Sequence, residues 1–214
     1  MACIEGFTVV AYSQLEYATA LAKSFCRHHP DGRFWIAIMD RPTFSLYSPD
    51  DSVRYLTAID LERVIPHYRE VAVALGDIHL AAHVAPLVAE RLAQECDYLF
   101  YFHYQSLVYT TLDSIVKDLG KCELLLVPRR LTPVPIDESY PTSHFFHHGG
   151  IFNTGFFGMN CRRTRFVEWW KNESQLTAHL EFPVDMRFLD QASVLFDSVI
   201  LRDPSFGVAF WNIE

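Results

Sequence analysis

The chain alternates between short runs of consecutive apolar residues and longer segments in which apolar positions recur every three or four residues. The short runs are rich in β-branched, leucine and aromatic side chains, which favour strands. Because they are apolar at consecutive positions, they are typical of strands that are covered on both faces. They predict strands at residues 6–12, 33–39, 53–59, 98–102, 123–127, 156–160 and 198–201.

The longer segments predict helices between these strands. Ser13 is the expected N-cap of the first of them. Pro86 interrupts another, and a proline beyond the first turn costs a helix about 3 kcal/mol, so we expect that helix to begin near Val84 or Ala85. Residues 128–141, with four prolines, and residues 144–155 are expected to be loops. The predicted helices are at residues 15–27, 61–68, 80–94, 112–119, 163–172 and 186–196.

Alternation of strands and helices predicts an α/β fold with a Rossmann-like, mixed and mainly parallel sheet that is flanked by helices. Asp40 follows the second predicted strand, and His103, Tyr104 and Gln105 follow the strand at 98–102. Ligands of such folds bind at the carboxyl ends of the strands, where Asp40 can accept hydrogen bonds from ribose hydroxyls. Taken alone, each residue is better explained by an ordinary turn or loop, so only their joint placement indicates a site.

Composition narrows the class of protein. The chain has 214 residues and a formal charge of −8, which disfavours a general nucleic-acid or anionic-membrane binder. We expect no membrane span, because no run of about 18 apolar residues occurs. We also expect no signal peptide. Five scattered cysteines without CxxC spacing predict free thiols in a reducing, cytoplasmic setting.

The order of the segments, together with GGIFNTGFFGM and FLDQASVLF, resembles the GT-A-type bacterial glycosyltransferases over nearly the whole chain. The resemblance implies a GT-A-like fold in a single domain, residues 1–214. Its nucleotide-binding half would span about residues 1–127, and its sugar and acceptor half about residues 128–214. The implied activity is transfer of a sugar from a nucleotide-sugar donor, with a UDP-sugar as the expected donor, to a carbohydrate or lipid-linked acceptor.

The resemblance also assigns candidate site residues. Its nucleotide site falls on Ala11, Tyr12, Ser13 and Asp40, and its diphosphate and sugar site on His103, Gln105, Arg129, Asn153, Gly155 and Gln191. Asp190, of the Asp-Gln pair, is the catalytic candidate. It would be the base in an inverting reaction or would stabilise the oxocarbenium-like sugar in a retaining one. Pro86, Trp211 and Asn212 also match the family pattern.

The departures concern the metal. The family's Asp-x-Asp falls on His103, Tyr104 and Gln105. Mg²⁺ and Mn²⁺ prefer charged oxygen ligands, so we assign no metal ligand and disfavour both ions as cofactors. Arg129, Arg130 and His103 would instead stabilise the leaving diphosphate.

Two further hypotheses remain. In one, the chain is a catalytically inactive, carbohydrate- or partner-binding relative. In the other, which we disfavour, His144, His147 and His148 hold a metal with Asp185 or Asp190. A partner subunit or a second copy of the chain could complete the acceptor site.

Overall fold

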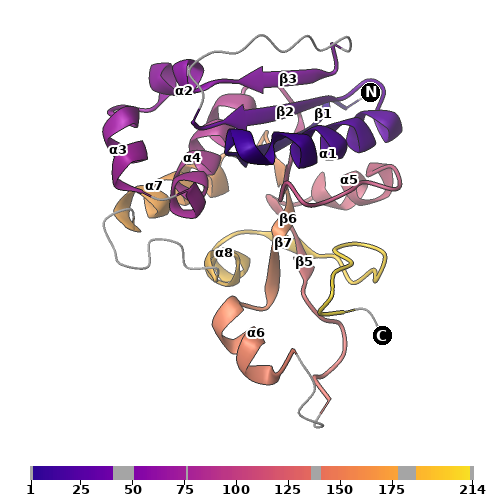
Figure 1. Cartoon of the computed structure of the whole chain (residues 1–214). Coiled ribbons are helices and arrows are strands. Elements are labelled where there is room, and N and C mark those ends of the chain that lie inside the picture. The colour runs from indigo at the N-terminus through magenta and orange to yellow at the C-terminus, as the bar shows by residue number, and fades with distance from the viewer. Residues whose placement is uncertain (1, 41–50, 76, 136–140, 178–186, 213–214) are drawn as a thin grey trace.

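One seven-stranded sheet forms the centre of the computed structural model, which describes residues 2–40, 51–75, 77–135, 141–177 and 187–212. The strand order is β3-β2-β1-β4-β6-β5-β7. All strands run parallel except β6, which is antiparallel to both of its neighbours. The predicted mixed, mainly parallel sheet is therefore confirmed (Figure 1). The strands are β1 (Ile4–Val10), β2 (Arg33–Ile38), β3 (Val53–Leu56), β4 (Tyr98–Phe102), β5 (Leu124–Pro128), β6 (Phe152–Asn160) and β7 (Ser198–Ile200).

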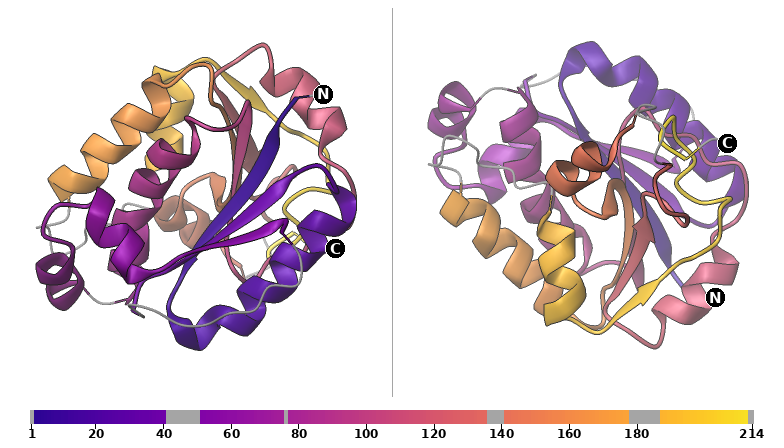
Figure 2. Two further views of the ribbon diagram at one scale, coloured as in Figure 1. Left: turned by 90° about the horizontal axis from the view of Figure 1, so that it is seen from above. Right: turned by 90° about the horizontal axis from the view of Figure 1, so that it is seen from below.

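Helices cover both faces of the sheet, with α1 and α5 on one face and α4, α7 and α8 on the other (Figure 2). α6 extends beyond the sheet at the end where β5 stops and β6 begins (Figure 1). The helices are the 3-10 turn η1 (Tyr12–Gln14), α1 (Leu15–His28), α2 (Ala58–Val64), α3 (Tyr68–Ala74), α4 (Asp77–Leu92), α5 (Asp113–Leu119), α6 (Ser143–Gly149), α7 (Arg165–Thr177) and α8 (Phe188–Leu195).

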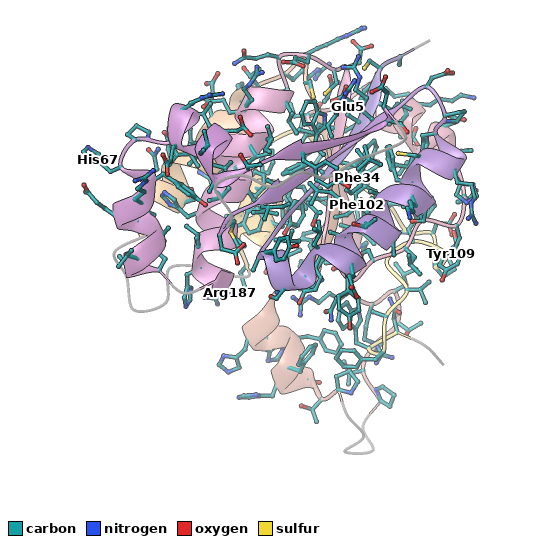
Figure 3. The ribbon with its side chains drawn as sticks, turned by 45° about the horizontal axis from the view of Figure 1, so that its top comes forward. Glu5, Phe34, His67, Phe102, Tyr109 and Arg187 are labelled. Carbon is teal, nitrogen blue, oxygen red and sulfur yellow. The ribbon has the colours of Figure 1, made fainter. Side chains whose placement is uncertain are left out.

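The two faces bury separate aromatic clusters. Between the sheet and α1, the ring centroid of Phe25 lies 5.3 Å from that of Phe34 and 5.9 Å from that of Phe102. Phe34 and Phe102 are labelled in Figure 3. On the opposite face, the Trp170 ring stacks on Phe188 at 5.5 Å. Burial of such rings contributes most of the stability of a core. The two aromatic clusters fix the sheet between its helices, so that the strand ends are held at defined positions.

Three local predictions are wrong. α4 begins at Asp77 and contains Pro86 in its interior, because burial of Val84, Val88 and other apolar residues of α4 outweighs the proline's cost. Residues 144–155 are not all loop: they contain most of α6 and the start of β6, which begins at Phe152 rather than at residue 156. Ser13 lies inside η1, and Gln14 occupies the N-cap position of α1.

Further expectations concern the thiols and the membrane. All five cysteines are free, and the Sγ atoms of Cys96 and Cys161 lie 3.4 Å apart. Within the described residues, no helix is both long and apolar enough to cross a bilayer. A cytoplasmic location stays a prediction.

Candidate active site at the carboxyl edge of the sheet

The candidate residues gather along one edge of the sheet. β2, β1, β4 and β5 all end there, and the antiparallel β6 begins there. In the strand order β2-β1-β4-β6-β5, each of these strands is hydrogen-bonded to the next. Neighbouring strands lie about 4.8 Å apart, so the edge from Asp40 to Arg129 spans roughly 19 Å. The edge is therefore long enough to contact an extended ligand that is made of several chemical groups.

At the ends of β1 and β2, the backbone N–H of Tyr12 donates to Asp40 Oδ1 at 2.7 Å. The N–H of Ala11 donates to Gln14 Oε1 at 3.1 Å, and Ala11 itself is buried. Tyr12, Ser13 and Asp40 are exposed. The hydrogen bond from Tyr12 orients the Asp40 carboxylate at the surface, and its second oxygen has no hydrogen-bond partner among the described residues. The structure thus brings together the four residues assigned to the nucleotide.

The ends of β4 and β6 meet at His103 and Gly155. The N–H of His103 donates to the Gly155 carbonyl at 2.7 Å, and the N–H of Gly155 donates to Asn153 Oδ1 at 2.9 Å. A Cβ on residue 155 would lie 3.1 Å from Asn153 Oδ1 and 3.2 Å from His103 Cβ, so glycine permits this close approach. His103 is exposed at the surface, but the protein around its ring partly desolvates it and lowers its pKa, because loss of water disfavours the charged imidazole.

Arg129 follows β5 and is only 5% exposed. Its guanidinium lies 5.7 Å from the ring centroid of Phe145 and 5.6 Å from that of Trp211. Its Nε–H donates to the Phe152 carbonyl at 3.1 Å. No carboxylate of the described residues forms an ion pair with it. Burial lowers the pKa of Arg129, and the negative charge of Asp190 partly opposes that shift.

Asp190 lies in the first turn of α8 and accepts hydrogen bonds from the backbone N–H of Ile151, at 3.1 Å to Oδ1 and 3.4 Å to Oδ2. Ile151 immediately precedes β6. This contact ties the carboxylate to the start of the strand that carries Asn153 and Gly155. The fold therefore places a carboxylate and a buried arginine near one another, as their electrostatic interaction shows.

Two of the assigned residues have few contacts with the rest of the site. Gln105 and Gln191 are exposed, and neither side chain forms a hydrogen bond within the described part of the chain.

The side chains at the Asp-x-Asp position do not suit a hard cation. His103 and Gln105 supply one imidazole and one neutral amide, whereas Mg²⁺ and Mn²⁺ bind charged oxygen ligands. Across residues 2–40, 51–75, 77–135, 141–177 and 187–212, no group of three or more His, Cys, Asp or Glu side chains could hold a metal. The rings of His144 and His148 in α6 are tilted at 49° with centroids 4.2 Å apart, and Asp185 lies outside the described residues.

The aromatic side chains around Arg129 were not predicted as site residues. Phe145 belongs to a segment expected to be a loop, and its position appears only once α6 is formed. Trp211 could be found only through its match to the Trp-Asn pair. Asn212 donates from Nδ2 to the Arg129 carbonyl at 3.2 Å. A pocket of about 180 Å³ adjoins this group rather than Tyr12 and Asp40; its lining includes Arg129, Arg130, Thr132, Leu201, Phe206 and Asn212.

No model of a known protein family and no curated protein matches the sequence. The structure, however, is similar to that of the galactosyltransferase LgtC in complex with donor and acceptor sugar analogues. The TM-score is 0.55 at 16% identity, over 94% of this chain and 74% of that one. A structure of an active-site mutant of LgtC matches equally well, also with a TM-score of 0.55.

Two larger proteins are also similar. The glycosyltransferase GlyE of Streptococcus pneumoniae gives a TM-score of 0.57 at 14% identity, over 96% of this chain and 46% of that one. TarS of S. aureus gives 0.54 at 12% identity, over 94% and 58%. The chain thus spans about half the length of these two neighbours. Together with the strand order, these similarities show that the chain has the fold of the GT-A-type glycosyltransferases.

Proposed function

We propose that the chain is a glycosyltransferase that moves a sugar from a nucleotide-sugar donor, most simply a UDP-sugar, to a carbohydrate or lipid-linked acceptor. The observation that carries this proposal is Arg129. Asp190 acts on this guanidinium electrostatically, but no carboxylate of the described residues forms an ion pair with it. A buried charge that is not ion-paired is costly unless a ligand supplies the opposite charge. Arg129 lies at the sheet edge where α/β folds bind ligands, and the polar residues of five neighbouring strands extend along that same edge.

In this proposal the donor lies along the edge, with its nucleoside at Tyr12 and Asp40 and its diphosphate towards Arg129. Transfer forms a bond between the acceptor oxygen and the anomeric carbon, and it breaks the bond between that carbon and the diphosphate oxygen. Negative charge grows on the leaving diphosphate. The Arg129 guanidinium, whose planar fork fits phosphate oxygens, would stabilise that charge without an Asp-x-Asp metal.

Asp190 is the proposed catalytic carboxylate. In an inverting displacement it would take the proton from the acceptor hydroxyl, and in a retaining reaction it would stabilise positive charge on the sugar. Its hydrogen bonds from the Ile151 N–H hold it in place for either role. Asn153, whose Oδ1 is engaged by Gly155, keeps its amide N–H groups available for a sugar hydroxyl.

One observation favours the alternative, a catalytically inactive relative that binds carbohydrate or a partner. Gln105 and Gln191 occupy family site positions but are exposed, and the described residues form no bonds with their side chains. A domain that has lost catalysis would retain the buried framework while such polar contacts disappear. The two functions differ in whether a nucleotide-sugar is bound and broken down.

The deciding experiment is calorimetric titration of the purified protein with UDP, GDP, CMP and their sugar conjugates, with Mn²⁺ and with chelator. We expect one nucleotide to bind with similar affinity in both conditions. Ligand binding to the native state also raises the melting temperature, which gives a second readout. Absence of binding by every nucleotide would support the non-catalytic alternative, and strict dependence on Mn²⁺ would contradict the metal-free assignment.

Asp190→Asn tests catalysis in the same protein. The variant should keep its fold and its nucleotide affinity but lose transfer or donor hydrolysis by roughly a hundredfold or more, the effect typical of removing a general base. Asp118→Asn is the matched control, because Asp118 is an exposed α5 carboxylate paired with Lys121. Unchanged turnover in Asp190→Asn would remove Asp190 from the mechanism.

A further inference from the structure

Three rings form a row beside the candidate site. Tyr17, in the first turn of α1, is 60% exposed. Its ring centroid lies 6.2 Å from that of Tyr104, at an interplanar angle of 62°. The Tyr104 ring in turn lies 4.4 Å from the His103 imidazole, at 35°. The row therefore connects the surface of α1 with the end of β4.

The row is continuous with the candidate site. The His103 N–H bonds the Gly155 carbonyl, and Gly155 bonds Asn153. Tyr104 packs against the buried cluster between the sheet and α1, which fixes the position of its ring. A ligand that covers these rings would thus lie next to the strand that carries Asn153.

We propose that Tyr17, Tyr104 and His103, whose rings are inclined to one another, form an aromatic platform that contacts a sugar ring of the acceptor. The assignment to an acceptor rests on the proposed function, whereas the capacity to bind a sugar does not. Two of its residues, His103 and Tyr104, fall on the positions that the sequence resemblance assigns to the family's Asp-x-Asp motif, so in this chain those positions would contact carbohydrate.

The chemistry of the platform matches a sugar better than a phosphate. Tyrosine rings offer apolar faces, and their hydroxyls can donate and accept hydrogen bonds. Partial desolvation lowers the pKa of His103, which disfavours the charged imidazole that an anion would need. The exposed Gln105 adds an amide at the rim. A pyranose presents the complementary surface, an apolar C–H face surrounded by hydroxyls.

The opposing interpretation is that the rings only pack against one another. Tyr104 is partly buried, and contacts between aromatic rings stabilise many surfaces. Packing alone, however, predicts no loss of sugar binding when the exposed Tyr17 is removed. The experiment therefore measures binding and stability separately.

Saturation-transfer NMR of the whole chain, without nucleotide, would use lactose, N,N′-diacetylchitobiose and maltotriose as probes. We expect saturation of ring protons of at least one sugar, with affinity about three- to tenfold weaker in Tyr17→Ala and in Tyr104→Ala. Tyr104→Phe, which keeps the ring, should retain most of the binding. Tyr109→Ala is the control, and it should leave the affinity unchanged. Tyr109 follows the same strand and is 81% exposed; Figure 3 labels it.

Each outcome bears on the platform. Lack of binding by all three sugars, or binding that survives both alanine substitutions in folded protein, would overturn it. The platform would also be overturned if Tyr104→Ala lost the saturation of the UDP base protons but left sugar binding unchanged, because the rings would then bind a nucleobase. If the platform binds sugar but no nucleotide binds anywhere, the proposed transferase fails and the platform stands. If a nucleotide binds and is turned over while no sugar saturates, only the platform fails.

Discussion

Replacing Arg129 with methionine separates a ligand-binding role from a structural one. Methionine has a similar length and no charge, and its sulfur makes favourable contacts with aromatic rings. In the native protein the guanidinium packs against the neighbouring rings of Phe145 and Trp211, and its Nε–H donates to the Phe152 carbonyl. The substitution therefore removes the charge while it fills the same aromatic enclosure.

The opposing contributions to stability can be compared. Loss of the charged hydrogen bond costs about 1.5–3 kcal/mol, and loss of two cation–π contacts costs about 0.5–2 kcal/mol each. Against this, removal of a buried charge relieves a desolvation penalty of several kcal/mol. We expect these contributions to cancel to within about 2 kcal/mol in the free energy of unfolding. A bound phosphate would lose a charged hydrogen bond, which weakens nucleotide binding roughly 10- to 150-fold.

Urea unfolding would measure the first quantity, and calorimetric titration with the nucleotide found above would measure the second. Arg162→Met is the control, because Arg162 pairs with Asp97 at the opposite end of β6 and is largely exposed. A fall of more than about 3 kcal/mol in the free energy of unfolding, together with unchanged nucleotide affinity, would refute the argument. Arg129 would then serve only to attach α6 and Trp211 to β5.

Two other predictions use contacts of single residues. Gly155→Ala should weaken nucleotide-sugar binding, because the added Cβ would lie 3.1–3.2 Å from Asn153 and His103. Gly158→Ala, whose Cβ would lie 2.6 Å from Phe100, should instead lower the free energy of unfolding by about 1–3 kcal/mol and leave the affinity unchanged. The reverse pattern would contradict both assignments. Burial lowers the pKa of His29 from its ordinary value of 6.5, so the unfolded chain binds a proton at this residue more readily than the folded chain does. The free energy of unfolding should therefore be highest above pH 6.5 and should decrease as the pH falls below that value. A series of urea titrations from pH 7.5 to 5 would test this, with His29→Gln showing a flatter dependence.

The sequence predicted the framework better than the site. β1, β2, β4 and β5 are runs of consecutive apolar residues. Such runs can be predicted from the local sequence, because a strand that is buried on both faces has apolar side chains at consecutive positions. α6 was missed because residues 143–149 (SHFFHHG) lack helical periodicity. α3 was missed because it begins directly after His67, which adopts a left-handed conformation with φ 56°. That conformation is decided by the surrounding structure rather than by residue type.

Residues of the candidate site were harder to evaluate. Arg129 and Arg130 are adjacent and identical in type, yet only Arg129 is buried, at 5% exposure, and packs against both Phe145 and Trp211. Its enclosure depends on α6 and the C-terminal segment, which are remote in sequence. Asp190 was found through its Asp-Gln pair, but its contact with the Ile151 N–H depends on tertiary packing that no local pattern encodes.

The antiparallel direction of β6 determines which insertions and deletions the candidate site can tolerate. Asn153 and Gly155 lie at the beginning of β6, so the chain enters the candidate site directly from α6. Because side chains alternate between the two faces of a strand, a shift of one residue in β6 would move Asn153 to the opposite face. Residues added or removed before α6, between residues 129 and 142, would leave that register intact. Variation in length there could therefore diversify what approaches the edge, while the buried strands and the aligned polar groups remain unchanged.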